Sequence, residues 1–381
     1  MRLPGVHSQL EQLIAISSVS STIAKHDQSN LPVVELLANW LTDLGFVAEL
    51  LPIPGNPGKA NLIATLGQGP GGLVLSGHTD TVPFDEHLWS SDPLKLTEKD
   101  GRFYGLGSSD MKGFFPLAIQ ASKPFLQKRL KQPLIILATA DEESSMSGAR
   151  ALQEAGTLQA QQAIIGEPTA LKPIRMQKGM MMQSITLEGQ SGHSSDPGLG
   201  NNAIEAMQKV LAELISLKHE LSNKYHNPLF QIPYPTLNFG SLHGGDNPNR
   251  ICGHCELQID LRPLPGMDLD ELRGLLQQRL QPLADQQQIS LSIKSLFCGI
   301  PAHETPAGAP IVKMVEKLTG YTAGAVNFAT EAPFLGKMGV DTVVWGPGDI
   351  EQAHQPNESL SIDRIAPTIS TLEQLINTFC V

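Results

Sequence analysis

The sequence predicts an α/β fold in which a larger domain, built on a helix-covered sheet, is interrupted by a smaller α+β domain. Strand-like and helix-like segments alternate up to about residue 172, which is typical of a sheet covered by helices. The pattern then changes, and the alternation resumes towards the end of the chain. The 381 residues also exceed the usual size of one domain. We expect a first domain of residues 1–174 and 297–381, and an inserted domain of residues 175–296.

In the first domain, short apolar runs predict buried strands and amphipathic segments predict helices. Residues 31–44 have helical periodicity and stop at Gly45, a residue that commonly follows a helix. Residues 113–130 predict another helix, although Pro116 and Pro124 interrupt the pattern. The strands are expected at the apolar runs of residues 73–75, 134–137, 163–165 and 342–345.

The inserted part predicts one compact unit. Its expected elements, in order, are a strand at residues 180–187, a helix at 202–217, a strand pair that includes residues 255–261, a helix at 269–280 and a strand at 289–296. The second helix is expected to stop before Pro282. This order describes an α+β unit of about 110 residues. A helix at residues 311–318 then belongs to the resumed first domain.

Composition limits the partners of the chain. The formal net charge is −11, from 27 basic and 38 acidic residues, and the sequence has no run of lysines or arginines. This balance argues against a nucleic-acid or anionic-membrane partner and favours neutral or cationic small substrates. No apolar stretch approaches the roughly 20 residues of a transmembrane helix, and the first residues lack a signal-peptide pattern. We therefore expect a soluble, cytoplasmic protein.

The cysteines do not suggest a disulfide framework. The chain has four, Cys252, Cys255, Cys298 and Cys380, and so few in so long a chain favour a reducing compartment. Cys252 and Cys255 have CxxC spacing, for which a redox motif or half of a zinc site are the functional alternatives. An alternating strand would place them on opposite faces because their offset is odd. A structural role is the favoured interpretation.

Potential metal ligands and catalytic carboxylates follow most of the predicted strands. They are His78 and Asp80 after residues 73–75, Glu142 and Glu143 after residues 134–137, Glu167 after residues 163–165, and His354 beyond residues 342–345. Open α/β sheets place ligands and chemistry at the carboxyl ends of their strands. Asp110 arrives differently, in a Gly- and Ser-rich segment, where it could cap the helix that follows.

This set of side chains suits a pair of divalent ions. Such ions lie about 3.5 to 4 Å apart and share a bridging carboxylate, with positions left open for water and substrate. We expect Asp110 to be the bridge. His78 and Glu167 would complete one site, and Glu143 and His354 the other. Mixed nitrogen and oxygen donors suit two zinc ions, with cobalt or manganese as alternatives.

Two further carboxylates are expected beside the metals. Asp80 would accept the ring N–H of His78 and fix its tautomer; the alternative is an ordinary polar loop. Glu142 would stay unligated, because adjacent residues in a turn can aim their side chains differently. As a general base, Glu142 would take a proton from water and return it to the leaving amine. The alternative for Asp141, Glu142 and Glu143 is a solvated acidic turn.

At this point the chain closely resembles the M20 metallopeptidases. The matching segments are SGHTDTVP at residues 76–83, YGLGSSDMKGF at 104–114, ATADEE at 138–143, IGEP at 165–168 and QAHQP at 352–356. They span nearly the whole chain in the family's order. The resemblance implies a mixed-sheet, zinc-peptidase-like catalytic domain, an inserted ferredoxin-like domain that mediates homodimerisation, two zinc ions, and hydrolysis of an acyl-amino acid amide.

The resemblance also implies roles for residues of the inserted domain. His193 lies in a segment similar to the one whose histidine stabilises the oxyanion in the active site of the partner subunit. Asn249 and Arg250 resemble the pair that binds a substrate carboxylate, a task that suits the guanidinium fork. Without the resemblance, His193 would be a surface-loop histidine and Arg250 a solvated residue at a strand edge.

The substrate is indicated by residues 327–333, which carry Thr330 and Glu331 and are similar to the acetylornithine deacetylases of the family. We expect Glu331 to bind a cationic substrate amine; alternatively, Thr330 and Glu331 hold a loop together. The implied reaction is deacetylation of N2-acetyl-L-ornithine in arginine biosynthesis. The alternatives are another M20 amidohydrolase, such as a desuccinylase, aminoacylase or dipeptidase, and a non-catalytic metal-dependent protein that binds an amino-acid derivative.

Overall fold

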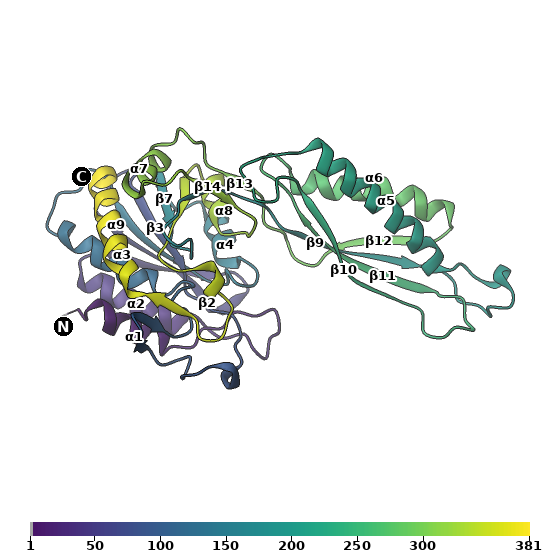
Figure 1. The fold of residues 1–381 in the computed structure, drawn as a ribbon, viewed down its shortest axis with the longest axis horizontal. Coiled ribbons are helices and arrows are strands. Elements are labelled where there is room, and N and C mark those ends of the chain that lie inside the picture. Colours follow the sequence, from purple (N-terminus) through teal and green to yellow (C-terminus); the bar gives the residue numbers. More distant parts are fainter. Residues whose placement is uncertain (1–2) are drawn as a thin grey trace. The chain divides into compact units, whose positions relative to one another are not determined.

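The computed structural model describes residues 3–381, which form two compact units (Figure 1). The first unit contains the described part of Met1–Arg175 together with Thr305–Gly324 and Thr330–Val381, and the second contains Met176–Glu304 and Ala325–Ala329. Residues 297–304 group with the second unit, where Ile300 forms a β-bridge with Met180. None of the described helices is both long and apolar enough to cross a membrane.

The first unit is built on a mixed sheet whose centre is parallel. The central strands are β6 (Leu134–Thr139), β3 (Leu73–His78), β7 (Gln162–Ile165) and β15 (Asp341–Val344). On one side β6 pairs antiparallel with β2 (Asn56–Leu66) and then β1 (Val47–Ile53). On the other side follow β8 (Ile174–Gln177), β13 (His303–Glu304) and β14 (Gly324–Val326). The central strands form at the apolar runs where the sequence predicted strands.

Helices cover this sheet (Figure 1). The main core lies between the sheet and α2 (Leu31–Asp43), α3 (Phe114–Ser122), α7 (Pro310–Thr319) and α9 (Ile365–Cys380). The remaining helices are α1 (Val6–Ile14), α4 (Ser147–Ala155) and α8 (Ala332–Lys337), of which α4 contacts α8. A small separate sheet contains β4 (Thr97–Lys99), β5 (Arg102–Tyr104) and β16 (Ser359–Ser361).

The helix predicted over residues 113–130 is shorter than expected. It ends as α3 at Ser122 and continues as a 3₁₀ turn, Lys123–Phe125. Pro116 is tolerated because it lies in the first turn, where backbone N–H groups have no helical partner. Pro124 ends the α-helix because proline has no N–H to donate to the preceding turn.

The second unit has a four-stranded antiparallel sheet in the order β10 (Thr236–Gly244), β11 (His254–Arg262), β9 (Met181–Glu188) and β12 (Ser290–Ser295). Two helices, α5 (Ala203–Lys224) and α6 (Leu269–Gln286), lie on one face of it (Figure 1). The chain order β-α-β-β-α-β and this strand order are those of a ferredoxin-like unit.

Two expectations for this unit were wrong. Helix α6 does not stop before Pro282 but continues through it, and the flanking Leu280 and Ala284 are fully buried, so core packing stabilises the last turns. Cys252 and Cys255 do not lie on opposite faces of one strand, because β11 begins only at His254. Both cysteines are buried in the core of the unit, and neither belongs to a potential metal group within the described residues.

Candidate metal centre

The predicted site residues of the first unit meet where the parallel strands end. His78 is the last residue of β3, Glu142 and Glu143 follow β6, and Glu167 follows β7. Neighbouring parallel strands bring these carboxyl ends to the same edge of the sheet. Two groups there have the spacing of metal ligands: His78 with Asp110 and Glu143, and His78 with Glu142 and Glu167.

Asp110 lies between two imidazoles. Its Oδ1 atom is 3.1 Å from Nε2 of His78, and its Oδ2 atom is 3.8 Å from Nε2 of His354. His78 also approaches Glu167, with 4.0 Å between Nε2 and Oε2. Burial by itself would raise the pKa of Asp110, but the contact with His78 and the nearby imidazoles lower it. The arrangement is that of a carboxylate placed to bridge two cations.

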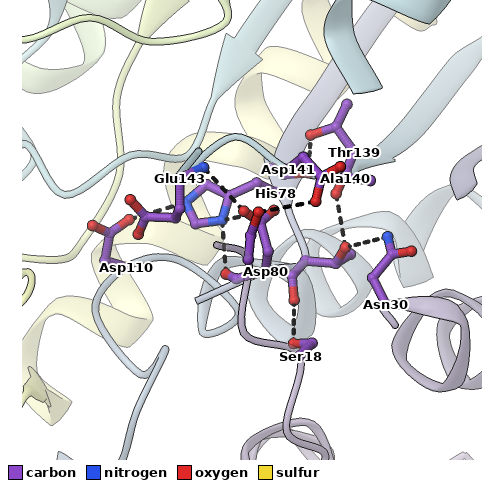
Figure 2. A network of polar contacts seen from close by, with 12 residues as sticks. Ser18, Asn30, His78, Asp80, Asp110, Thr139, Ala140, Asp141 and Glu143 are labelled. Carbon is purple, nitrogen blue, oxygen red and sulfur yellow. Dashed lines mark hydrogen bonds and ion pairs between the residues drawn. The ribbon is translucent and has the colours of Figure 1, made fainter. Parts of the chain in front are cut away.

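The expectation that Asp110 caps a helix was wrong. The residue before α3 is Gly113, and no side chain caps that end of the helix. The carboxylate of Asp110 is instead directed towards His78, as Figure 2 shows.

Glu143 and His354 form the other half of the cluster. Nε2 of His354 lies 2.9 Å from Oε2 and 3.1 Å from Oε1 of Glu143. The imidazole is half-exposed, whereas the Glu143 side chain is 7 % exposed, so this side of the cluster is open to solvent at His354. The carboxylate of Glu143 chiefly accounts for the raised pKa of His354.

Asp80 contacts His78 differently from the expectation. The ring Nδ1 of His78 lies 2.9 Å from the backbone carbonyl oxygen of Asp80, and the carboxylate is farther away at 3.7 Å. The carboxylate instead accepts the backbone N–H of Glu143 at 3.0 Å. The backbone carbonyl therefore orients the imidazole, while the Asp80 side chain holds the Glu142–Glu143 turn (Figure 2).

Crowded carboxylates dominate the electrostatics of the cluster. Burial and the charge of Glu167 raise the pKa of Glu142 well above its usual range. Burial and the charge of Asp110 do the same for Glu167, whose Oε1 has no hydrogen-bond partner among the described residues. Divalent cations would compensate this negative charge, and the imidazole and carboxylate donors suit zinc. The residues present therefore fit a metal pair.

Glu358 is a residue of this site that the sequence analysis missed. Its buried carboxylate accepts the backbone N–H groups of Gly107, Ser109 and Asp110 at 2.9, 2.7 and 2.9 Å. Burial raises its pKa to about 8. Glu358 thus connects the segment that carries His354 with the segment that carries Asp110. Its position after a Pro-rich stretch gave no signal of this contact.

Thr330 and Glu331 are both buried beside the cluster. Oε2 of Glu331 accepts a hydrogen bond from Oγ1 of Thr139 at 2.8 Å, and Oε1 has no partner among residues 3–381. Burial raises the pKa of Glu331 to about 7. Thr330 accepts the backbone N–H of Ala332 at 3.2 Å. One oxygen of Glu331 thus bonds to Thr139, and the other is buried without a hydrogen-bond partner in the described part of the chain.

The remaining predicted residues lie together on the second unit. His193 and Arg250 face each other across a β-bridge, and the backbone carbonyl of Asn249 accepts the N–H of Ser194. Nδ1 of His193 accepts the backbone N–H of Ser195 at 3.2 Å. Oγ of Ser195 also lies 2.7 Å from Nδ1, and Nε2 is a donor in the tautomer that carries the proton on that atom. The Arg250 guanidinium pairs with Asp246 and is exposed.

Comparison with known proteins decides the family. The model of peptidase family M20/M25/M40 matches residues 74–378, most of the chain. The chain belongs to this family. It is 50 % identical over 381 residues to an acetylornithine deacetylase of Photorhabdus laumondii, covering 100 % of this chain and 99 % of that one. It is 52 % identical over 379 residues to an acetylornithine deacetylase of Edwardsiella ictaluri, with coverage of 100 % and 99 %.

Solved structures confirm the M20 fold. The aminopeptidase PepT of Bacillus cereus superposes with a TM-score of 0.77 at 19 % identity, covering 97 % of each chain. The M20 metallo-carboxypeptidase Sso-CP2 of Sulfolobus solfataricus has a TM-score of 0.76 at 19 % identity and 99 % coverage of each. The resemblance noted in the sequence and the predicted fold class are thus confirmed, and the chain is a metal-dependent hydrolase of the M20 family.

Proposed function

We propose that this hydrolase deacetylates N2-acetyl-L-ornithine to L-ornithine and acetate, a step of arginine biosynthesis. The observation that carries the proposal is a sequence identity of 50 % and 52 %, over the full chain, to proteins named acetylornithine deacetylase. The cluster of His78, Asp110 and Glu143 beside a partly buried Glu142 supports amide hydrolysis by this chain. The acidic net charge suits a substrate with a cationic side chain.

The metal pair would be held by two sets that share Asp110. His78 and Glu167 belong to one set, and Glu143 and His354 to the other. Bound divalent ions, zinc with cobalt or manganese as substitutes, would polarise the acyl carbonyl and lower the pKa of water. Each set combines one imidazole with two carboxylates, counting the shared one, and this leaves room for water and substrate.

Glu142 is the proposed general base and acid. It follows Asp141 in the turn that also holds Glu143. Potential ligand atoms of Glu142, His78 and Glu167 lie within 4.8 Å of one another. With Asp110 supplying the third donor at that position, Glu142 remains free. Its carboxylate takes a proton from the attacking water and returns it to the leaving amine of ornithine.

The other proposed residues bind and orient the substrate. Asn249 and Arg250 would hold the carboxylate, because an exposed guanidinium can donate to both oxygens. Nε2 of His193 would donate to the developing oxyanion from the partner subunit. The unpartnered oxygen of Glu331 would accept the side-chain ammonium of ornithine, and Thr330 would fix that loop.

A homodimer in the cytoplasm is part of the proposal. On the second unit, Ile204, Ile215 and Leu242 are 48 %, 45 % and 50 % exposed. They line an apolar hollow with Met207 and Leu211, beside β10 at the edge of its sheet. A second copy of the chain would cover these side chains.

Hydrolysis rates on a small substrate panel test the function. The panel contains N2-acetyl-L-ornithine, N-acetyl-L-norvaline, N-acetyl-L-methionine and N-succinyl-L,L-diaminopimelate, each assayed with metal-depleted and zinc-restored protein. We expect zinc-dependent turnover with kcat/KM highest for acetylornithine. Higher kcat/KM for the succinyl compound would assign a desuccinylase, and binding without turnover of any compound would assign a non-catalytic protein.

A further inference from the structure

A lysine is buried beneath the turn that carries Glu142 and Glu143. Lys59 lies in β2, and its side chain is 1 % exposed. Its ammonium is paired with the Asp27 carboxylate at 2.9 Å and with the Asp141 carboxylate at 2.7 Å. A buried ammonium is costly unless it is paired, so this lysine constrains both carboxylates.

Asp141 is the residue through which Lys59 reaches the site. It has a positive φ of 58°, a conformation that L-residues adopt only at a cost. Its Oδ1 atom accepts from Ser20 at 2.9 Å and its Oδ2 atom from Ser147 at 2.7 Å. Its backbone carbonyl accepts the N–H of Met146 at 2.6 Å. These contacts hold the first residue of the turn on its buried side.

The other side of the turn is held by Asp80, which accepts the backbone N–H of Glu143. Asp141 and Asp80 therefore fix the peptide units on either side of Glu142. These peptide units set where the Glu142 and Glu143 side chains leave the backbone, so the positions of both carboxylates depend on them.

We propose that Lys59 is a positioning residue for hydrolysis: acting through Asp141, it sets the turn that aims Glu142 at the attacking water and Glu143 at the metal. This rests on the proposed function only in the roles given to those two glutamates. The ion pairs of Lys59 are with Asp27 and Asp141, neither of which is a proposed metal ligand. Its ion pair with Asp141 is the contact that reaches the turn, and its ion pair with Asp27 compensates the rest of its buried charge.

The test compares Lys59→Met, Asp141→Asn and the double variant with the parent enzyme, loaded with zinc and assayed on N2-acetyl-L-ornithine. Asparagine tolerates positive φ, so Asp141→Asn removes charge without forcing the backbone to change. We expect each single variant to lower kcat by roughly tenfold to a hundredfold, as small displacements of reacting groups do, with KM changed less than about threefold. The double variant should be no worse than the poorer single variant, because both changes break the same link.

Two controls separate positioning from general loss of stability. Asp27→Asn removes the other partner of Lys59 and leaves the turn untouched, so kcat should stay near the parent value. Leu37→Ala removes a fully buried side chain of α2 and should lower the midpoint of thermal unfolding without lowering kcat. If Lys59→Met does not fold, the comparison of Asp141→Asn with Asp27→Asn still decides.

The visible spectrum of the cobalt-loaded protein gives a second readout. Lys59→Met and Asp141→Asn should alter the spectrum at unchanged cobalt content, because Glu143 is displaced, whereas the two controls should not. Kcat losses that multiply in the double variant, or an equal loss in Asp27→Asn and Asp141→Asn, would overturn the proposal. A parent enzyme without activity on acetylornithine would instead refute the proposed substrate, and the cobalt spectrum would still test the positioning.

Discussion

The Nε2 atom of His78 lies 3.1 Å from Oδ1 of Asp110. The other oxygen of Asp110 faces His354, so one carboxylate lies between two imidazoles that come from distant parts of the sequence. A carboxylate in this position can donate one oxygen to each of two cations. We therefore expect the pairing of the metals to depend on Asp110.

Replacing Asp110 with asparagine should remove bound metal. The amide keeps the size of the side chain but loses the charge and one anionic oxygen, so neither metal retains its shared ligand. We expect zinc content after dialysis to fall from about two ions per chain to less than one, measured by elemental analysis. Asp43→Asn, an exposed change on α2, should leave the zinc content unchanged. Full zinc content in Asp110→Asn would exclude the bridging role.

Replacing Glu358 with glutamine should destabilise the chain and weaken metal binding. The amide nitrogen cannot accept the N–H groups that the carboxylate now accepts, and a buried unsatisfied donor costs about 1 to 3 kcal/mol. Urea unfolding of the metal-free protein measures this loss. Glu351→Gln, at an exposed position nearby, is the matched control. Equal stability of the Glu358 variant and the parent would show that these contacts are not needed.

Replacing Glu331 with glutamine should reduce kcat/KM for N2-acetyl-L-ornithine more than for N-acetyl-L-norvaline. Norvaline has the same three-carbon side chain without the ammonium, so only the first substrate loses a charge-assisted hydrogen bond, worth about 1.5 to 3 kcal/mol. That value corresponds to roughly tenfold or more in the ratio of the two kcat/KM values. An equal loss on both substrates would exclude the amine-binding role and leave Glu331 with only its hydrogen bond from Thr139.

Lys178 predicts a pH effect on stability outside the metal centre. Burial and nearby Arg262 lower the pKa of Lys178 to about 8, and its ammonium donates to the carbonyl of Tyr234 at 2.7 Å. In the unfolded chain a lysine pKa is about 10.4. Between these values the unfolded state binds the additional proton, so the contribution of Lys178 to the free energy of unfolding rises with pH. Below about pH 8 both states are protonated and this contribution is constant.

Urea unfolding of the parent and of Lys178→Met between pH 7 and 10.5 checks this sign. The difference in free energy, parent minus variant, should be flat below about pH 8 and increase above it. A difference that stays flat throughout, or falls with pH, would show that folding does not lower the pKa of Lys178.

Much of the fold was predictable because its signals are local. The apolar runs that form β3, β6, β7 and β15 are short and are followed by polar residues. Central parallel strands typically have this pattern because both of their faces are buried. Most ligand candidates were predictable for the same reason, since they follow such a run, whereas Asp110 lies in a Gly- and Ser-rich segment. The helix boundaries at Pro124 and Pro282 differed from the predicted ones in opposite directions. The α3 helix ends before Pro124, as the lack of a proline N–H favours, whereas packing of Leu280 and Ala284 lets α6 continue through Pro282.

The supporting contacts could not be predicted because they join distant parts of the sequence. Glu358 reaches Asp110 across 248 positions, and Ser20 reaches Asp141 across 121. In the sequence these residues look like solvated loop positions, and Lys59 looks like a polar residue of a strand. Only the fold reveals that these side chains are buried. The Asp80 carboxylate, expected on His78, holds the backbone of Glu143 instead, a distinction that spacing alone does not contain.

Glu142 is proposed to take the proton of the attacking water while neighbouring residues hold the metals. Turnover of N2-acetyl-L-ornithine by Glu142→Gln, measured together with the zinc content of the same sample, tests this role most directly. We expect zinc content equal to that of the parent and kcat lowered by about 10² to 10⁴, whereas Glu143→Gln should lose zinc. Parental turnover in Glu142→Gln, or a loss of zinc as large as in Glu143→Gln, would rule out the proposed role of Glu142.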